Sequence, residues 1–226
     1  MFFDLLFPSR CVGCKGFGKS LCSKCRNNIT PTRIDVCPGC FRPSILGITH
    51  PYCREKTLLD GALSVVQYRG VTRSIIKEAK YRLAYNTLED FLKHTPATWY
   101  EKFHIFSTKI SSATLCPIPL HKTKYNTRGF NQSDILSKTF GKITSLKIEK
   151  NLVRVKNTLP QANQKSRAMR MINMRGAFEM NINKKPSNTV ILVDDLFTSA
   201  NTANEAARIL KSNGIKQVYL FVLAHG

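Results

Sequence analysis

Short apolar runs alternate with segments of helical character along most of this chain. Runs rich in Val, Ile, Leu and Phe at 61–68, 114–120, 189–193 and 216–224 are typical of strands. Residues 71–82, 86–103 and a segment that begins near 201 are expected to be helices. Strands that alternate with helices in this way predict a parallel α/β sheet flanked by helices.

The run at 189–193 is uniformly apolar, which is expected for a strand buried on both faces of a sheet. It ends in two carboxylates, Asp194 and Asp195, and small or hydroxylated residues lie between Thr198 and Thr202. Alanines then recur at helical spacing, so a helix is expected next. Thr202 and Glu205 have the spacing of a capping box at the start of that helix.

This strand, acidic pair, loop and helix start predict a site for a phosphorylated sugar. Free backbone N–H groups and the helix dipole favour an anion at the loop. Asp194 and Asp195 would stand at the carboxyl end of a parallel strand, where ligands bind in open α/β sheets, and can accept hydrogen bonds from vicinal hydroxyls. The alternative is an ordinary strand, loop and helix with a surface pair of aspartates.

A basic segment follows the run at 114–120. Pro117 and Pro119 interrupt that run, so its end is expected at the edge or mouth of the sheet. The next segment, 121–132, is expected to be a loop, and its basic side chains are His121, Lys122, Lys124 and Arg128. Lysine supplies a point charge and arginine a bidentate fork. The basic side chains of such a loop can bind a pyrophosphate.

Seven of the eight cysteines lie between positions 11 and 53. The first set consists of two Cys-x-x-Cys turns, with the candidate ligands Cys11, Cys14, Cys22 and Cys25. Two such turns complete a tetrahedral zinc shell, and nearby lysines and arginines would offset the charge of four thiolates. Zinc here is expected to be structural, because a small segment with little apolar content needs a metal or another cross-link to fold stably.

The second set contains only three cysteines: Cys37, Cys40 and Cys53. His50 lies three residues before Cys53 and could complete a Cys-Cys-His-Cys shell through an imidazole nitrogen. Two alternatives stay open, a zinc site completed by His50 and a site that has lost its metal. Another pairing of the turns, such as 11 and 14 with 37 and 40, also stays open.

The charge balance points to polyanions as partners. The 226 residues include 35 basic and 14 acidic ones, which gives a formal charge of +21. Nucleic acid, anionic lipid and phosphorylated ligands fit this charge, and a merely solvated basic surface is the alternative. No stretch is long and apolar enough to span a bilayer, and segment 1–7 lacks the basic leader of a signal peptide. A cytoplasmic protein is therefore expected, with segment 1–7 as a docked turn of helix or as an anchor at the inner face of the membrane.

Several motifs resemble those of known families. Residues 193–202 resemble the phosphoribosyl pyrophosphate (PRPP) loop of type I phosphoribosyltransferases, with Ser199 in place of a threonine and Ala200 in place of a glycine. The Cβ of Ala200 would crowd a bound phosphate or disfavour a positive φ. Residues 6–14, 117–120, 128–132 and 193–202, in this order, resemble the ComF family of ComFC-like late competence proteins. The sequence Arg-Gly-Phe-Asn-Gln at 128–132 is the most diagnostic of these motifs.

The resemblance implies a phosphoribosyltransferase-like domain at 59–226 that follows a zinc-finger domain at 1–58. It implies a competence protein that binds PRPP and zinc and handles incoming single-stranded DNA during natural transformation. The alternative is an active phosphoribosyltransferase with an unknown acceptor, and a third hypothesis is a zinc-stapled nucleic-acid binder without PRPP. The implied partners include a DNA-translocation helicase and recombination factors at the inner membrane.

The hypothetical PRPP site, with Mg²⁺, follows from these motifs. Its residues are Asp194 and Asp195 at the ribose, Thr198, Ser199, Ala200, Asn201 and Thr202 at the 5′-phosphate, and His121, Lys122 and Arg128 near the pyrophosphate. No residue stands out as a base for an acceptor, so catalysis stays an open question. The polar, basic and methionine-rich segment 157–175 is expected to form either a hood over this site or a mobile loop.

Overall fold

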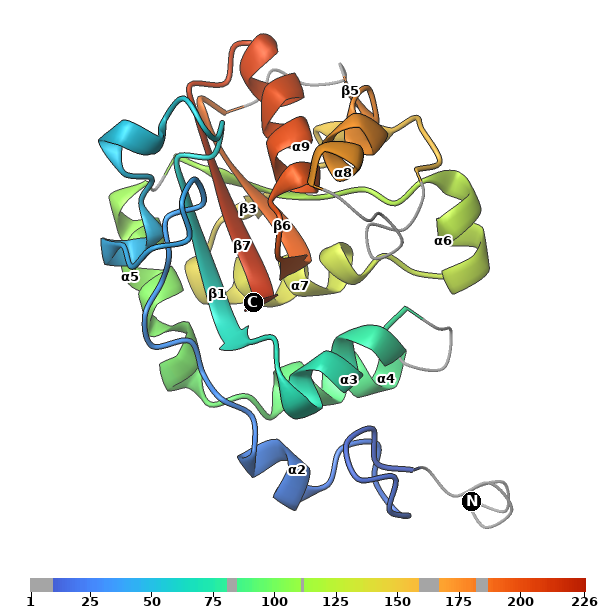
Figure 1. The fold of residues 1–226 in the computed structure, drawn as a ribbon. Helices are drawn as coiled ribbons and strands as arrows, with labels where there is room; N and C mark the ends of the chain where they lie inside the picture. Colours follow the sequence, from blue (N-terminus) through green and yellow to red (C-terminus); the bar gives the residue numbers. More distant parts are fainter. Residues whose placement is uncertain (1–9, 81–84, 111, 159–166, 182–186) are drawn as a thin grey trace.

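A five-stranded parallel sheet forms the centre of the molecule (Figure 1). The computed structural model describes residues 10–80, 85–110, 112–158, 167–181 and 187–226. The strands, in their order across the sheet, are β1 (Gly61–Gln67), β7 (Gln217–His225), β6 (Thr189–Phe197), β2 (Thr114–Pro117) and β3 (Lys147–Ile148). Every pairing of neighbours in this sheet is parallel. The predicted parallel α/β sheet is therefore confirmed.

The two central strands send alternate side chains into two separate apolar cores. Ile191 and Val193 of β6 face the first core together with Phe221 of β7. Leu192 of β6 and Val222 of β7 face the second core. Because both faces of the sheet are covered, these strands are continuous apolar runs in the sequence.

Helices cover both faces of the sheet (Figure 1). The first core is closed by α3 (Gly70–Glu78), α4 (Tyr85–Lys93), the 3₁₀ turn η4 (Ala97–Tyr100), α5 (Glu101–Lys109) and α7 (Gln132–Thr144). The second core is closed mainly by α9 (Asn201–Ser212). Aromatic rings fill the first core: Phe103 stacks on Phe140 with ring centroids 4.9 Å apart and meets Phe221 edge-on at 4.8 Å.

The single helix predicted for 86–103 is wrong. The segment is divided into α4, η4 and the beginning of α5. Pro96 lies at the break, as the residue before η4. Proline has no N–H to donate and disfavours helical geometry in the residue before it, so the helix ends there.

Two further elements differ from expectation. Segment 121–132 is not a loop, because it contains α6 (Lys122–Arg128), which ends at Gly129 with a left-handed φ of 81°. The strand predicted for 189–193 runs through the acidic pair and ends at Phe197. Basic and acidic side chains predicted for one site thus lie on regular elements, which hold them more rigidly than loops would.

The N-terminal part consists mostly of turns. It contains α2 (Ser23–Asn27) and the 3₁₀ turns η1 (Ile45–Gly47) and η2 (Pro51–Cys53). Isolated bridges join Pro31 to Val66 and Ile48 to Gly61, so this part lies alongside β1. At Gly47 a side chain would collide with the carbonyl group of Ala62, and only glycine allows this close approach.

A two-stranded antiparallel sheet lies outside the main one. It consists of β4 (Leu152–Arg154) and β5 (Phe178–Met180), and α8 (Arg167–Met174) precedes β5 and packs against α9. The short strand predicted at 177–180 corresponds to β5. Within the described ranges no helix has the length and apolar character needed to cross a membrane. The domain boundary between residues 58 and 59 stays a prediction.

Candidate metal centres and anion-binding site

The first cysteine set converges on one point. The sulfur atoms of Cys11, Cys14, Cys22 and Cys25 all lie within 4.8 Å of one another. The Sγ atoms of Cys14 and Cys22 are 3.8 Å apart. A tetrahedral zinc ion with Zn–S bonds of about 2.3 Å requires sulfurs about 3.8 Å apart, so this geometry fits zinc. The alternative pairing of the turns is wrong for the described residues.

The second set includes the histidine. Ligand atoms of Cys37, Cys40, His50 and Cys53 also lie within 4.8 Å of one another. Nδ1 of His50 is 3.4 Å from Sγ of Cys40. Tyr52 stacks on the imidazole, with ring centroids 5.1 Å apart, and its hydroxyl lies 3.0 Å from Nδ1. The side chains therefore offer a complete Cys-Cys-His-Cys shell, and Tyr52 is a supporting residue that the sequence did not indicate.

Backbone amides support the sulfurs of both sets. The N–H of Cys22 donates to Sγ of Cys11, and the N–H of His50 donates to Sγ of Cys37, each with a nitrogen–sulfur distance of 3.4 Å. Such donors stabilise a thiolate and fix its direction, as is typical of the groups that surround metal ligands. The two clusters thus share one local design.

The thiol pKa values respond to burial and to these amides. Burial raises the pKa of Cys11, but backbone amides outweigh it and lower the pKa to about 6. The amide of Arg42 is the main reason why the pKa of Cys40 falls to about 6. Burial and the neighbouring sulfurs raise the pKa of Cys25 to about 12 and that of Cys53 to about 11. A zinc ion among the sulfurs would favour the thiolate form of all of them.

The second cluster contacts the end of β6 and the start of α9. Phe41, directly after Cys40, stacks on Phe197 with ring centroids 5.3 Å apart. The side-chain oxygen of Asn204 accepts hydrogen bonds from the Thr57 hydroxyl at 2.8 Å and from the Leu58 N–H at 2.9 Å. The N-terminal part is therefore fastened to both sides of the loop that contains residues 198–200.

Asp194 is held by donors at the end of the sheet. The hydroxyl of Ser133, at the start of α7, donates to its Oδ1 at 3.2 Å, and the N–H of Asp195 donates to the same oxygen at 2.9 Å. Burial and the charge of Asp195 raise the pKa of Asp194 to about 7, although these donors and Arg154 oppose the rise. Near neutral pH a cation or a hydroxyl donor that binds beside this carboxyl therefore readily shifts it to the ionised form.

Two arginines interact electrostatically with the acidic pair, and Lys124 interacts in turn with these arginines. Burial lowers the pKa of Arg128, and the charges of the two aspartates oppose that effect. Burial also lowers the pKa of Arg154, and the charge of Asp194 opposes it. Burial, and then repulsion from Arg154 and Arg128, lower the pKa of Lys124 to about 8. A group of like charges this close to the carboxylates offers an anion a place beside them.

Other contacts fix these cations in place. Arg154 donates to the Thr158 hydroxyl and lies over the Phe178 ring, 5.3 Å from its centroid. Nζ of Lys124 donates to the Thr158 carbonyl at 2.7 Å. The small sheet and α6 therefore meet at Thr158 and present their charges together.

The motif at 128–132 has a clear structural role. Gly129 ends α6, and the Asn131 side chain caps α7 by accepting from the N–H two residues on, at 3.2 Å. The same side chain donates to the Ile118 carbonyl beyond β2 at 3.0 Å. Gln132 accepts from Arg128 at 3.3 Å and donates to a carbonyl after α3. The motif thus joins four elements around the position of Arg128.

The predicted capping box at Thr202 and Glu205 is wrong. Helix α9 begins at Asn201, and no side chain among the described residues caps it. The Glu205 carboxylate instead accepts from the N–H of Gly176 at 2.7 Å and from Arg208 at 2.8 Å. The first N–H groups of α9 are left without a side-chain cap, which is the arrangement in which a helix start binds an anion.

Ala200, which stands where the PRPP loop of the resembled family has glycine, has a left-handed conformation. Its φ is 56° and it is buried. We expect Ala200→Gly to raise the free energy of unfolding by about 0.5–1 kcal/mol, because glycine adopts this conformation without strain. Urea unfolding at constant zinc measures the change. Ala203→Gly, inside α9, is the control and should destabilise by about 1 kcal/mol; equal losses in both variants would show that Ala200 is unstrained.

Two predicted residues are not joined to this group. Nδ1 of His121 accepts from the N–H of Thr123 at 3.3 Å, at the start of α6, and Lys122 is exposed. In the described part of the chain neither side chain forms a hydrogen bond or ion pair with the acidic pair. Their role at a pyrophosphate stays a prediction, as does that of the loop at 198–202.

The sequence did not assign Ser133 or Arg154 to this site. Ser133 follows the 128–132 motif directly, and that adjacency was the available signal. Arg154 comes from β4 and reaches the acidic pair only through the fold. Of the segment 157–175 that was predicted to form a hood, α8 is described and ends at the buried Met174. Four other residues of that segment lie outside the described ranges: Gln161, Asn163, Gln164 and Lys165.

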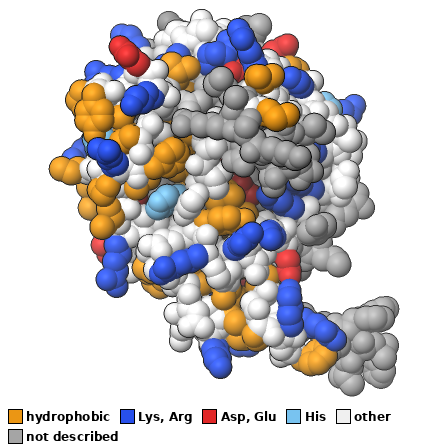
Figure 2. Space-filling view, in the orientation of Figure 1, with side chains coloured by type: hydrophobic (Ala, Val, Ile, Leu, Met, Phe, Trp, Pro, Cys, Tyr) orange, Lys and Arg blue, Asp and Glu red, His pale blue; other side chains and the backbone are white. Residues whose placement is uncertain are grey.

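Basic side chains also dominate the charged surface. Figure 2 shows lysines and arginines spread over the visible face, where few acidic side chains are seen. This distribution agrees with the formal charge of +21. A dispersed basic surface is suited to contacts with a backbone of phosphates.

Comparisons with known proteins agree with the motifs. Residues 2–56 match the double zinc ribbon domain. Over 96% of its length the chain is 25% identical to competence protein F of Haemophilus influenzae, of which 97% is covered. It is 25% identical to competence protein ComFC of Bacillus subtilis, with 87% of this chain and 80% of that protein covered. It is 27% identical to the DNA utilization protein YhgH of Salmonella typhimurium, with 90% and 89% covered. The resemblance to ComF proteins is confirmed.

Proposed function

We propose that this chain serves the uptake or use of incoming DNA. It is homologous to ComF competence proteins along most of its length, and its residues 2–56 match a double zinc ribbon. In this proposal it binds single-stranded DNA on its basic surface and PRPP with Mg²⁺ at the acidic pair. The work would take place in the cytoplasm, at the inner face of the membrane, beside a DNA-translocation helicase and recombination factors.

One observation carries the PRPP part of the proposal. A carboxylate pair and a group of cations lie together at the carboxyl end of β6, next to an uncapped helix start. A simple anion would be repelled by Asp194 and Asp195, whereas a plain diol would not use Arg128 or Arg154. A phosphorylated ribose satisfies both groups, with its hydroxyls on the aspartates and its phosphates on the cations and on the N–H groups of α9.

The residues also fit Mg²⁺. Carboxylate oxygens are the ligands that this hard cation takes from proteins, usually together with phosphate oxygens and water. The magnesium ion would neutralise part of the pyrophosphate charge. Arg128 would orient the same group through its planar fork.

The DNA part rests on charge. A surface with a formal charge of +21 favours phosphate backbones irrespective of sequence. Such binding weakens steeply with salt, because each contact releases counterions.

A catalytic phosphoribosyltransferase is the second candidate. The observation that favours it is the pKa of about 7 at Asp194, since a general base is most effective when its pKa lies near the working pH. In this function Asp194 would accept the proton of an acceptor as pyrophosphate leaves. Acceptor-dependent release of pyrophosphate would support it.

We expect calorimetric titration of Mg–PRPP to give saturable binding that is lost in the double variant Asp194→Asn with Asp195→Asn. Anisotropy of a labelled oligo-dT should show DNA binding to both proteins, with log affinity falling against log salt by about 0.7 per phosphate contact. The control is Glu55→Gln with Glu101→Gln, which removes two exposed acidic charges elsewhere. Absence of heat from the unmodified protein would refute the PRPP site, and salt-independent DNA affinity would refute the basic surface.

A further inference from the structure

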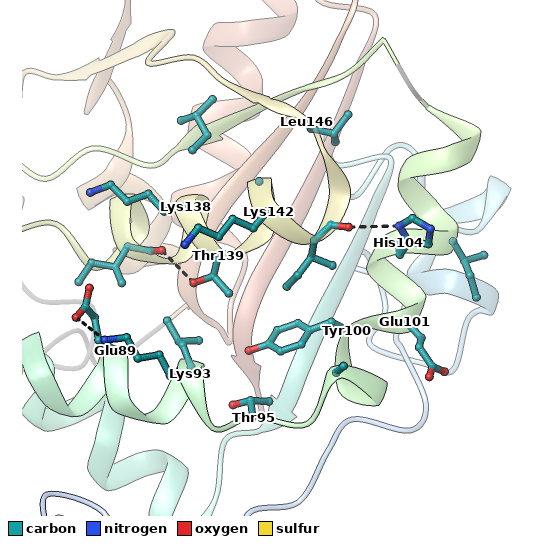
Figure 3. A pocket seen from close by; sticks show the side chains of 17 residues that line it. Glu89, Lys93, Thr95, Tyr100, Glu101, His104, Lys138, Thr139, Lys142 and Leu146 are labelled. Carbon is teal, nitrogen blue, oxygen red and sulfur yellow. Dashed lines mark hydrogen bonds and ion pairs between the residues drawn. The ribbon is translucent and has the colours of Figure 1, made fainter.

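A large hollow of the described structure lies away from the sites above. Its volume is about 1200 Å³, and α4, η4, α5, α7 and β3 surround it (Figure 3). It shares no lining residue with the acidic pair, the loop at 198–202 or the metal clusters. We call it the α4–α7 groove.

The groove is apolar and open to solvent. Leu92, Ile135 and Leu146 line its buried part. Ile105 of α5 and Ile148 of β3 stand at its edges with 50% and 41% of their surfaces exposed. Aliphatic side chains left half exposed around a hollow of this size are typical of an interaction surface.

An unsatisfied polar group points into the groove. Tyr100 is only 5% exposed, and its hydroxyl makes no hydrogen bond of good geometry with any described residue. Burial raises the pKa of Tyr100 to about 12, and the nearby Thr95 only partly offsets this rise. The Thr95 hydroxyl itself donates to the Phe91 carbonyl. Figure 3 shows the Tyr100 hydroxyl directed towards the middle of the groove. The hydroxyl oxygen has almost no exposed surface, so an occupant with an acceptor oxygen reaches it only when the side chains around it shift.

A glycine interrupts the wall of the groove. Gly141 lies inside α7, where glycine is less favourable than alanine. Its φ is not left-handed, and an added Cβ would meet Ile148 and the Leu146 carbonyl only at 3.5 Å, an ordinary contact. The fold therefore does not require glycine here. The missing side chain leaves room for a close approach to the backbone at this point of the wall.

The charges at the rim select the occupant. Figure 3 shows the amino groups of Lys93, Lys138 and Lys142 on one side and Glu101 on the other. Lys93 pairs with Glu89 at 3.6 Å, whereas Lys138 and Lys142 have no ion pair within the described ranges. A second copy would bring the same lysines and a charge of +21 against them, which is unfavourable. An acidic partner is favoured.

We propose that the α4–α7 groove docks an amphipathic helix of an acidic partner protein. The apolar side of that helix lies over Leu92 and Leu146, its backbone comes closest at Gly141, and its carboxylates meet Lys138 and Lys142. Insertion of a helix into an apolar groove is a recurrent mode of recognition, in which anchors recur every three or four residues. This docking surface is separate from the proposed DNA and PRPP functions.

The probe is an 18-residue fluorescent peptide with leucines at helical spacing and glutamates elsewhere. A scrambled peptide of the same composition controls for charge attraction to the basic protein, and a peptide with lysines in place of glutamates controls for apolar contact. Anisotropy with the full chain should show saturable binding of the acidic helix. Both control peptides should bind at least tenfold more weakly.

Variants locate the binding. Gly141→Ala should raise the melting temperature and yet weaken binding about tenfold, a combination that a purely structural glycine would not give. Lys138→Glu with Lys142→Glu should reverse the preference towards the lysine peptide. Tyr100→Phe should weaken binding about fivefold. Arg73→Glu with Lys77→Glu, on the exposed side of α3, is the matched control and should leave the preference for the acidic peptide over the lysine peptide unchanged.

Three results would overturn the proposal. Equal binding of the scrambled peptide, or an unchanged preference after the charge reversal, would mean that the groove is not the site. Concentration-dependent dimers that Gly141→Leu abolishes would assign the groove to a second copy. Binding to anionic vesicles that the same variant abolishes, without peptide binding, would assign it to lipid.

Discussion

Removal of zinc should unfold the N-terminal quarter of the chain and weaken the rest. Cys11, Val12, Leu21 and Ile29 are buried in the same core as Leu63 of β1, so loss of the first cluster opens that core. Structural zinc contributes on the order of 10 kcal/mol to small domains, and we expect the whole chain to lose several kcal/mol. Hydrogen exchange before and after chelation should show protection lost over residues 10–56 first.

Zinc counting separates the two clusters. The purified protein should release two zinc ions, whereas Cys22→Ser and His50→Ala should each release one. Cys116→Ala is the control: this buried cysteine lies in β2, outside both clusters, and the variant should keep two ions. One zinc ion in the unmodified protein, unchanged in His50→Ala, would mean that the second cluster holds no metal.

Asp194→Asn should stabilise the free protein and abolish the proposed PRPP binding. The pKa of Asp194 is raised from its usual value to about 7, so ionisation of this carboxyl opposes folding. The folded state binds the extra proton between about pH 4 and pH 7. Stability from this group therefore falls as pH rises through that window, and the full penalty applies above it. Each pKa unit corresponds to about 1.4 kcal/mol.

The gain should be smaller than the shift alone implies. Asparagine leaves Arg128 and Arg154 with less opposing charge, so we expect about 1–2 kcal/mol at pH 8 and about half as much at pH 5.5. Urea unfolding of both proteins at the two pH values measures the difference. Asp134→Asn, which removes an exposed pair with Lys150, is the control and should have almost no effect. A gain that is equal at both pH values would contradict the raised pKa.

Local spacing was enough to indicate the candidate ligands of both cysteine clusters and the acidic pair that follows the apolar run at 189–193. Cys-x-x-Cys turns carry their geometry within four residues, and a buried parallel strand is a continuous apolar run. The partners of Asp194 could not be found this way. Ser133 and Arg154 come from α7 and from a separate two-stranded sheet, and only the packing of those elements brings them to β6.

The wrong predictions share a cause. Thr202 and Glu205 have the spacing of a capping box, but the Glu205 carboxylate accepts hydrogen bonds from two other residues. Gly176 lies in a distant part of the sequence, and Arg208 lies one turn further along α9. The segment after Leu120 was expected to be a loop that presents basic side chains. Its helix is short, with no buried side chain, and so it leaves no apolar periodicity to detect.

The stack of Phe41 on Phe197 connects the second cysteine cluster to the strand that carries the acidic pair, so we expect zinc binding and the proposed ligand binding to be coupled. Phe41 follows a candidate zinc ligand, and Phe197 ends the strand that carries the acidic pair, just before the loop at 198–200. Any free energy by which zinc orders this contact must appear again as tighter binding at the strand end. Such coupling is reciprocal, so an occupied strand end would raise zinc affinity by the same factor. The supply of metal in the cell would then influence how strongly the proposed anionic ligand is held.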